Sequence, residues 1–186
     1  MPAAIITKDE VLSRLLEVFR RDGYDGASLA EISRATGLGK SSLYNHFPGG
    51  KEQMALEVLA ALGASLERDL FAPLAAAGPR EKRLDAMLEA IDAFYDGGNK
   101  ACLLERLAAS VDRRPFSRPL AAAFTRWMGA IEALAIEAGV KGAVAARRAE
   151  DAVVRIEGAL VVSAAMGETG PFERALADIR ATLLEP

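Results

Sequence analysis

Residues 40–47 carry a high density of hydrogen-bond donors. If Leu43 and Phe47 face inward, helical spacing turns the remaining polar side chains outward. The outward side chains are then Lys40, Ser41, Tyr44 and Asn45. Ammonium, hydroxyl and amide groups of this kind donate to phosphate oxygens and to base edges in the major groove. A surface helix without such a role would more often show pairs of Glu and Lys, so the segment predicts chemistry directed at nucleic acid.

A second group with affinity for anions follows at once. Lys51 opens a longer helical pattern after Gly49 and Gly50, so free backbone N–H groups and an ammonium meet there. Tyr44 and His46 would flank the same phosphate strand. His46 is the only histidine of the chain; a lone histidine is often structural, but beside these donors we favour a phosphate contact.

Two short helices joined by a glycine turn are expected to position the donors. Ser28 and Glu31 have the spacing of a capping box, which starts a helix. Residues 37–39, Gly-Leu-Gly, interrupt that helix after two turns, and a second helix over 40–47 ends before residues 48–50, Pro-Gly-Gly. The arrangement over residues 28–47 is that of a helix-turn-helix, whose second helix enters the major groove.

The rest of the chain is also predicted to be helical. Alanine and leucine dominate, and β-branched and aromatic residues are few. Apolar residues recur at steps of three and four over residues 12–19, 51–70, 84–95, 102–111, 120–139 and 172–183. Over residues 143–167 they surround the expected helix on nearly every side. Pro73–Pro79 is the expected linker, and Pro115–Pro119 separates two helices. The predicted fold class is all-α, with about nine helices in total.

Composition excludes several classes of protein. A net charge of −3 argues against coating nucleic acid through bulk charge. Cys102 is the single cysteine, so no internal disulfide forms, and the N-terminus lacks the pattern of a secretory signal. The longest uncharged run, Gly158–Gly167, is far below the roughly 20 apolar residues that span a bilayer. We expect a cytoplasmic protein without a membrane segment.

Nucleotide, metal and catalytic sites find no support. Residues 39–41, Gly-Lys-Ser, imitate the end of a phosphate-binding loop, but Arg34 stands where that motif needs glycine. No carboxylate pair or Cys–His set recurs on one helix face. The sequence therefore predicts no cofactor, no metal and no enzyme activity.

The N-terminal part of the chain resembles the tetracycline-repressor (TetR) family of bacterial transcription factors. The matching residues are Ser28-Leu29-Ala30-Glu31-Ile32, Gly37-Leu38, Lys40-Ser41-Ser42-Leu43-Tyr44-Asn45-His46-Phe47 and Pro48-Gly49-Gly50-Lys51-Glu52. The resemblance is specific over residues 5 to about 60 and continues as helix number and length, and in the ending over residues 170–176. It departs at Gly39, where relatives frequently carry serine or alanine, so the second helix lacks a side-chain cap.

The resemblance implies a three-helix DNA-binding domain over residues 5–65 and a ligand-sensing and dimerisation domain over 66–186. It implies operator contacts from Ser28, Lys40, Ser41, Tyr44, Asn45, His46 and Lys51. It further implies that the last two long helices form a homodimer and that a small molecule enters among the fourth to eighth helices. The expected function is a sequence-specific regulator, a repressor that the ligand releases from double-stranded operator DNA.

Two apolar sets in the C-terminal part are candidates for these roles. The expected dimer interface consists of Val153, Ile156, Leu160, Val161, Phe172, Leu176, Ile179 and Leu183, which a chain this small cannot easily cover alone. A cavity for an apolar or aromatic ligand would be lined by Met87, Phe94, Tyr95, Cys102, Trp127 and Met128. The same residues at helical spacing also suit an ordinary core, and Cys102 suits a redox sensor, a pocket thiol or a buried core residue.

Two alternatives remain beside the regulator. The first is a helical ligand-binding enzyme that keeps a vestigial DNA module and uses Cys102 as its reactive group. The second is a module whose helix-turn-helix contacts a partner protein. The polar exterior of residues 40–46 speaks against the second, because a protein interface would show more apolar anchors.

Overall fold

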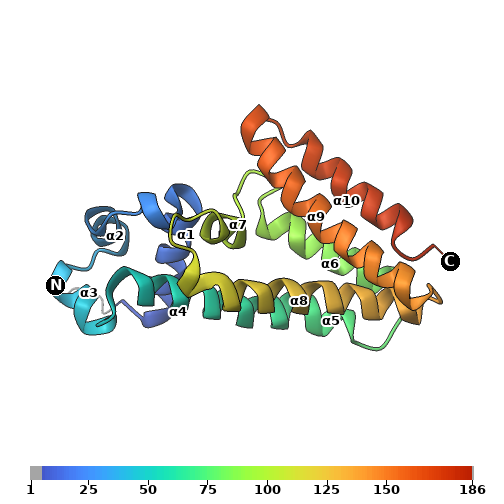
Figure 1. Ribbon diagram of the computed structural model, residues 1–186, viewed down its shortest axis with the longest axis horizontal. Coiled ribbons are helices and arrows are strands. Elements are labelled where there is room, and N and C mark those ends of the chain that lie inside the picture. The colour runs from blue at the N-terminus through green and yellow to red at the C-terminus, as the bar shows by residue number, and fades with distance from the viewer. Residues whose placement is uncertain (1–5, 186) are drawn as a thin grey trace. The chain divides into compact units, whose positions relative to one another are not determined.

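The computed structural model describes residues 6–185, and every regular element in that range is a helix (Figure 1). The elements are α1 (Lys8–Gly26), α2 (Leu29–Thr36), α3 (Lys40–His46), α4 (Gly50–Leu66), η1 (Glu67–Phe71), α5 (Ala72–Leu74), α6 (Arg80–Phe94), α7 (Leu103–Ala108), α8 (Arg114–Glu137), α9 (Gly142–Met166) and α10 (Gly170–Thr182). With η1 and α5 counted as the continuation of α4, the described residues form nine helices. The predicted all-α class with about nine helices is confirmed.

The helices form two units. The first comprises the described residues up to Leu62 together with Leu103–Pro119, and the second comprises Gly63–Cys102 and the described residues from Leu120 onward. Boundaries at 5–65 and 66–186 would assign Leu103–Pro119 to the C-terminal domain. The structure groups this segment with the N-terminal helices, because α7 packs on α1 and Phe116 is fully buried.

The first unit has a core to which each of its three N-terminal helices contributes. Leu15 of α1, Ile32 of α2 and Leu43 of α3 are completely inaccessible to solvent, as is Phe47 directly after α3. These are the inward positions that the helical spacing predicts. The core therefore fixes which side of α3 faces outward.

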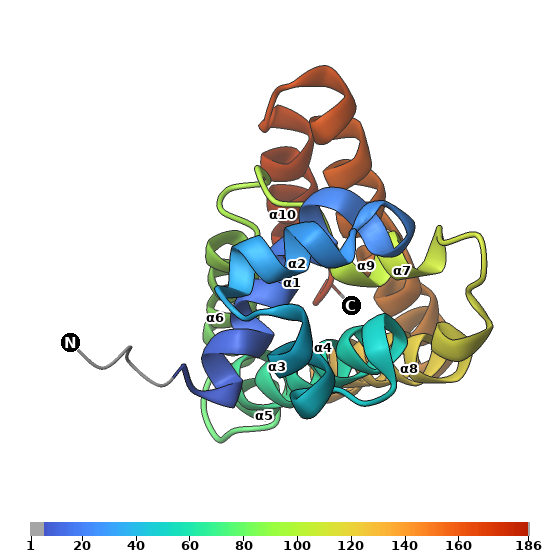
Figure 2. The same cartoon turned by 90° about the vertical axis from the view of Figure 1, so that its left-hand side faces the viewer.

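In the second unit, α9 and α10 lie side by side in both views (Figures 1 and 2). Gly167 ends α9 in the left-handed conformation, with φ 68°, and its N–H donates to the Ser163 carbonyl. Pro171 stands in the first turn of α10, where a missing N–H costs nothing. The short turn lets the two helices bury one face of each against the other.

Helix α8 begins earlier than the sequence indicates. Pro115 and Pro119 suggest a separator before Leu120, yet the helix runs from Arg114 through both prolines. Pro115 lies in the first turn, where no intrahelical N–H bond is expected, and Pro119 removes a single hydrogen bond. The full burial of the Phe116 side chain between them favours the helical conformation.

None of the helices in residues 6–185 combines the length and the apolar character needed to cross a membrane.

Candidate nucleic-acid interface

A capping box starts α2, as the spacing of Ser28 and Glu31 predicts. Ser28 Oγ accepts a hydrogen bond from the Glu31 N–H at 3.2 Å, and the Ser28 N–H donates to Glu31 Oε2 at 3.4 Å. Both side chains satisfy backbone or hydroxyl groups of the first turn. Ser28 is exposed, so its hydroxyl lies at the surface of the unit while it holds the helix.

The turn between α2 and α3 is held by several hydrogen bonds. Gly37 is left-handed, with φ 73°, and its N–H donates to the Ser33 carbonyl at 2.9 Å. Arg14 of α1 donates to the Thr36 carbonyl at 3.1 Å, and Ser33 Oγ donates to the Leu38 carbonyl at 2.6 Å. These bonds fix where α3 begins. Gly39 caps α3 without a side-chain hydrogen bond, as its lack of a side chain requires.

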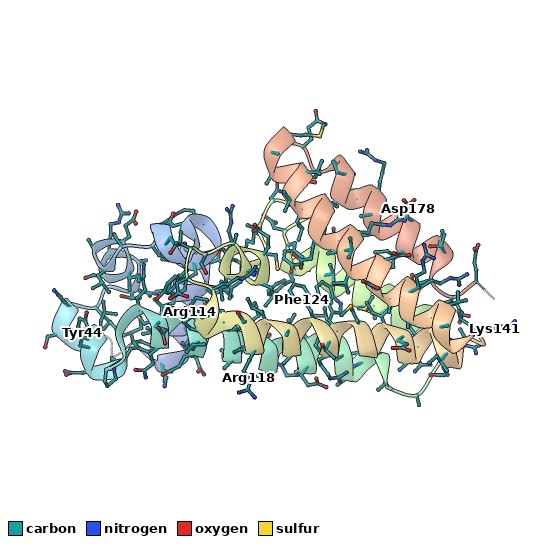
Figure 3. All side chains as sticks on the ribbon, in the orientation of Figure 1. Tyr44, Arg114, Arg118, Phe124, Lys141 and Asp178 are labelled. Atoms are coloured by element: carbon teal, nitrogen blue, oxygen red, sulfur yellow. The ribbon has the colours of Figure 1, made fainter. Side chains whose placement is uncertain are left out.

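The outer side of α3 presents several exposed polar side chains. Lys40, Ser41, Tyr44, Asn45 and His46 are all exposed, and Figure 3 marks Tyr44 on the outer side of α3. No hydrogen bond or ion pair inside residues 6–185 occupies the side chain of any of the first four. Their donors are therefore available to an external acceptor.

His46 lies at the surface rather than in the core. Its ring stands 6.3 Å from the ring of Phe47, centroid to centroid. A buried structural histidine is thereby excluded for this position, and the phosphate contact stays a prediction.

The start of α4 differs from the simple anion site that the sequence suggests. Gln53 Oε1 accepts the Gly49 N–H at 2.6 Å. Lys51 Nζ donates to the carbonyls of Tyr24 and Ala27 at 2.8 and 3.1 Å, and it lies 4.6 Å from the centroid of the Tyr24 ring. The ammonium is thus engaged with the end of α1. Sequence reasoning missed both Tyr24 and Gln53. The Tyr24 contact depends on how α1 and α4 pack, whereas the Gln53 contact is local, four residues from Gly49.

The hydrogen bonds of Gln53 at the start of α4 lead to an ion pair. Gln53 Nε2 donates to Glu57 Oε1 at 2.7 Å, and Lys8 Nζ lies 2.7 Å from Glu57 Oε2. The hydrogen bond from Lys8, assisted by that from Gln53, holds the pKa of the Glu57 carboxyl below its ordinary value. Glu57 therefore stays ionised and links the start of α1 to α4.

The structure brings together three of the six residues predicted to line a ligand cavity. Tyr95 packs against Phe94 with ring centroids 5.0 Å apart, and its hydroxyl donates to Cys102 Sγ at 3.3 Å. Met87 and Trp127 are buried as well. A cleft of about 400 Å³ in the second unit is lined by other residues, among them Glu89 and Glu173. The predicted cavity stays a prediction.

The part of the chain that the structure describes contains no candidate metal site. No set of three or more His, Cys, Asp or Glu side chains there could hold an ion.

The residues predicted to form a dimer interface lie mostly inside the chain itself. Seven of the eight are buried, namely Val153, Ile156, Leu160, Phe172, Leu176, Ile179 and Leu183. They face the α9–α10 contact and the core of the second unit, so other side chains of the same chain cover their apolar surface. Only Val161, which is 51% exposed, remains on the surface. The other exposed apolar side chains of α9 therefore lie on another face of the helix.

That outer face also carries apolar side chains. Val154 is 63% exposed, Val162 45% and Met166 58%, and Gly158 and Ala165 lie exposed between them. Together with Val161 these residues recur at three- and four-residue steps, so they form one stripe along the helix. We call Val154, Gly158, Val161, Val162, Ala165 and Met166 the outer stripe of α9.

Comparison with known proteins gives the same assignment for both parts of the chain. A family model described as "Bacterial regulatory proteins, tetR family" matches residues 11–58. A second, described as "Transcriptional regulator LmrA/YxaF-like, C-terminal domain", matches residues 82–178, more than half of the chain. The two matches together span the helix-turn-helix and most of the later helices.

Curated relatives match mainly over short stretches of the chain. The transcriptional regulator LmrA of Bacillus subtilis is 43% identical over 53 residues, 28% of each chain. YxaF of the same organism is 33% identical over 61 residues, so the chain covers less than a third of the length of either relative. The repressor DhaR of a Mycobacterium species is 28% identical over 142 residues, 74% of this chain and 69% of that one.

Solved structures share the fold over nearly the whole chain. A TetR transcriptional regulator from Legionella pneumophila has a TM-score of 0.86 and 18% identity, and the match covers 97% of this chain and 98% of that one. A cysteine mutant of the TetR-family regulator CifR, solved with 26-base-pair operator DNA, has a TM-score of 0.75 and 21% identity over 98% of each chain. With the family models on both units and the predicted helix-turn-helix in place, the chain belongs to the TetR family of bacterial regulatory proteins.

Proposed function

We propose that this chain is a transcriptional repressor that binds operator DNA as a homodimer. The observation that carries the proposal is the outer side of α3, opposite the buried Leu43. There the side chains are exposed and make no hydrogen bond or ion pair within residues 6–185, namely those of Lys40, Ser41, Tyr44 and Asn45. Lys40, Ser41 and Asn45 are expected to contact base edges in the major groove. Its relatives support repression: DhaR is named a repressor and IcaR of Staphylococcus epidermidis a negative regulator. A protein that acts on chromosomal DNA works in the cytoplasm.

Phosphate anchoring is assigned to Ser28, Tyr44 and His46. All three are exposed, one at the start of α2 and two on α3. In a helix-turn-helix the first helix crosses the backbone while the second lies in the groove, so side chains at these places reach the flanking phosphates. Such contacts set the register of the protein on the duplex and carry no sequence information themselves.

Genome-wide footprinting with the purified protein, followed by titration of the recovered sites, tests the DNA assignment. Tyr44→Ala is expected to weaken binding to all sequences alike, because it removes a phosphate contact. Asn45→Ala is expected to relax preference at one base pair by about 1–3 kcal/mol. Thr125→Ala, an exposed substitution on α8, is the control. Unchanged titrations for both α3 variants would overturn the assignment.

The outer stripe of α9 supports the homodimer. Exposed valine and methionine side chains on one helix face lose contact with water when a second copy covers them, and the exposed Gly158 lets two helices approach closely. Two half-sites one helical turn apart, about 34–36 Å, then require two copies of α3 at matching separation. The operator is therefore expected to be palindromic.

Sedimentation tests the dimer. Val161→Asp places a charge in the centre of the stripe and is expected to shift the chain to monomer at micromolar concentration. Val144→Asp introduces the same charge at another exposed valine of α9, before the stripe begins, and is expected to leave the dimer intact. A Val161→Asp protein that sediments as the unmodified chain does would contradict the assignment.

Regulation by a small apolar or aromatic molecule completes the proposal. A ligand that binds the C-terminal helices better in the state that releases DNA lowers operator affinity, and DNA lowers ligand affinity by the same factor. The aromatic group of Phe94 and Tyr95 beside Cys102 supports an apolar site near the end of α6. Thermal shift screening of apolar and aromatic compounds, with and without operator DNA, tests it: a compound that stabilises the free chain and not the complex is expected.

A further inference from the structure

Trp127 of α8 lies in the core of the second unit with its indole N–H unused. The residue is 3% exposed, and Nε1 has no hydrogen-bond partner within residues 6–185. A buried tryptophan usually places this N–H on an acceptor, because an unsatisfied buried donor destabilises the folded chain. The indole therefore needs an acceptor that the described part of the chain does not supply.

A small rotation within the chain does not provide this acceptor. Ser163 on α9 is also buried with an unpaired Oγ. A serine hydroxyl can turn, however, and donate to the carbonyl one turn earlier in its own helix. The indole N–H lies in the ring plane and points in one direction for a given ring position. Trp127 is therefore the stronger indication of an acceptor from outside the chain.

The neighbours of Trp127 on α8 offer no acceptor either. Leu120, Ile131 and Leu134 share one side of the helix with it and are all buried. We call this the inner side of α8. A buried water molecule typically makes about three hydrogen bonds to polar groups, and this apolar side does not provide them. An acceptor atom on an otherwise apolar molecule suits the place better than water.

Space reaches the inner side of α8 close to the indole. Phe124 stands three residues before Trp127 on the same side of the helix, and it is only half-buried. Figure 3 shows Phe124 on the side of α8 that is turned toward α6 and α9. An aromatic side chain that faces other helices and still meets solvent has unfilled space beside it. An apolar molecule can therefore lie against Phe124 while its acceptor atom meets Trp127.

The helix beside this part of α8 is irregular. Arg126 donates to the two carboxylate oxygens of Glu67 at 2.8 and 2.6 Å and lies 5.0 Å from the centroid of the Phe71 ring. These contacts bring η1, a π-helix, to the level of Trp127. A π turn inserts an extra residue into a helix and occurs frequently at functional sites. The irregular turn and the unused N–H thus lie at the same level of the second unit.

We propose that Trp127 donates a hydrogen bond to the small molecule that regulates this chain. That molecule combines an apolar body with an acceptor such as a carbonyl oxygen or an aromatic nitrogen. This rests on the proposed regulation by a ligand and specifies the chemistry of that ligand. Because an indole N–H only donates, neither a pure hydrocarbon nor an ammonium group would satisfy it.

Nuclear magnetic resonance of the free chain tests the contact directly. Trp127 is the only tryptophan, so a proton–nitrogen correlation spectrum contains a single indole cross-peak. The probes are pairs of similar shape, in which only the first member carries an acceptor: acetophenone and ethylbenzene, quinoline and naphthalene, fluorenone and fluorene. An acceptor probe is expected to move the indole proton downfield, and its hydrocarbon partner is not. If no acceptor probe moves it downfield, the proposal is overturned, and magnetisation exchange of the unmoved cross-peak with water would identify bound water as the partner.

Trp127→Phe keeps an aromatic ring and removes the N–H. In calorimetric titrations without DNA, it is expected to reduce the preference for the acceptor probe over its hydrocarbon partner about threefold to tenfold, the equivalent of one net hydrogen bond. Ile131→Val is the matched control, because it removes one buried carbon atom from the same side of α8 and no polar group. It is expected to leave the preference unchanged. A preference that Trp127→Phe retains in full would refute the contact.

Operator titrations separate this contact from the proposed function. An acceptor probe that engages Trp127 is expected to weaken operator binding by the unmodified chain, and Trp127→Phe is expected to need about threefold to tenfold more of it. A probe that moves the indole cross-peak and leaves operator affinity unchanged would confirm the contact while contradicting regulation by ligand. The two failures are therefore distinguishable.

Discussion

Substituting Gly98 with alanine tests the packing between the segment after α6 and the start of α10. Gly98 has φ 93°, and a Cβ built there would lie 2.9 Å from both Cβ and Cδ1 of Phe172. Phe172 is fully buried, and the Tyr95 ring stands 6.0 Å from it at a steep angle, so the phenyl ring cannot move aside cheaply. The added methyl group therefore meets a fixed neighbour in a backbone conformation that alanine disfavours.

The expected cost has two parts. The positive φ costs alanine roughly 1–2 kcal/mol. Overpacking of a well-filled core costs roughly 1–3 kcal/mol more. Gly98→Ala is thus expected to lower the free energy of unfolding by about 2–5 kcal/mol, a large part of the roughly 5–15 kcal/mol that stabilises a typical domain.

Gly97 is the matched control. It has φ 63°, but a Cβ there would have no neighbour within 4 Å, so Gly97→Ala carries the backbone cost alone. Denaturant unfolding followed by circular dichroism measures both variants, at one protomer concentration because association adds to apparent stability. If Gly98→Ala is no more destabilising than Gly97→Ala, the argument from the Phe172 overlap fails.

Three further predictions concern single side chains. Ser28→Ala removes the cap of α2 and is expected to lower the free energy of unfolding by about 0.5–2 kcal/mol, whereas Ser41→Ala, which caps nothing, leaves thermal unfolding unchanged. Lys8 holds the pKa of Glu57 below the unfolded value, so the stabilisation is present above the unfolded pKa and is lost as pH falls through the folded one. The stability of Glu57→Gln, measured by denaturant titration from neutral pH into the acid range, should therefore fall less than that of the unmodified chain. Cys102→Ala is expected to keep full operator affinity in gel-shift titrations, and a loss of turnover on any substrate in that variant would favour the enzyme alternative.

Local patterns were sufficient for the helix-turn-helix. Ser28 and Glu31 are three residues apart and meet within one turn, so their hydrogen bonds follow from the sequence. Leu43 and Phe47 are four apart and share one face of α3, which leaves the polar residues outside. Each of these relations lies within one turn of helix, the range over which spacing determines geometry.

Relations between distant segments could not be predicted in this way. Lys51 meets carbonyls 27 and 24 residues earlier, and nothing in the spacing distinguishes that contact from an exposed lysine. Helix α9 is apolar around most of its circumference, so periodicity could not tell which valines face α10 and which face outward. Val153 is buried and its neighbour Val154 is exposed, a difference that only the packing of α10 and the core decides.

This division of α9 separates two properties that evolution can change independently. Substitutions on the buried side, such as at Ile156, alter the hydrophobic core and therefore the viability of the fold. In the proposed homodimer, substitutions in the outer stripe alter the affinity of one copy for another. After a gene duplication, a few exchanges in the outer stripe could stop mixed pairs from forming between two regulators while both kept the same core. Each daughter protein could then acquire its own operator without interference from the other.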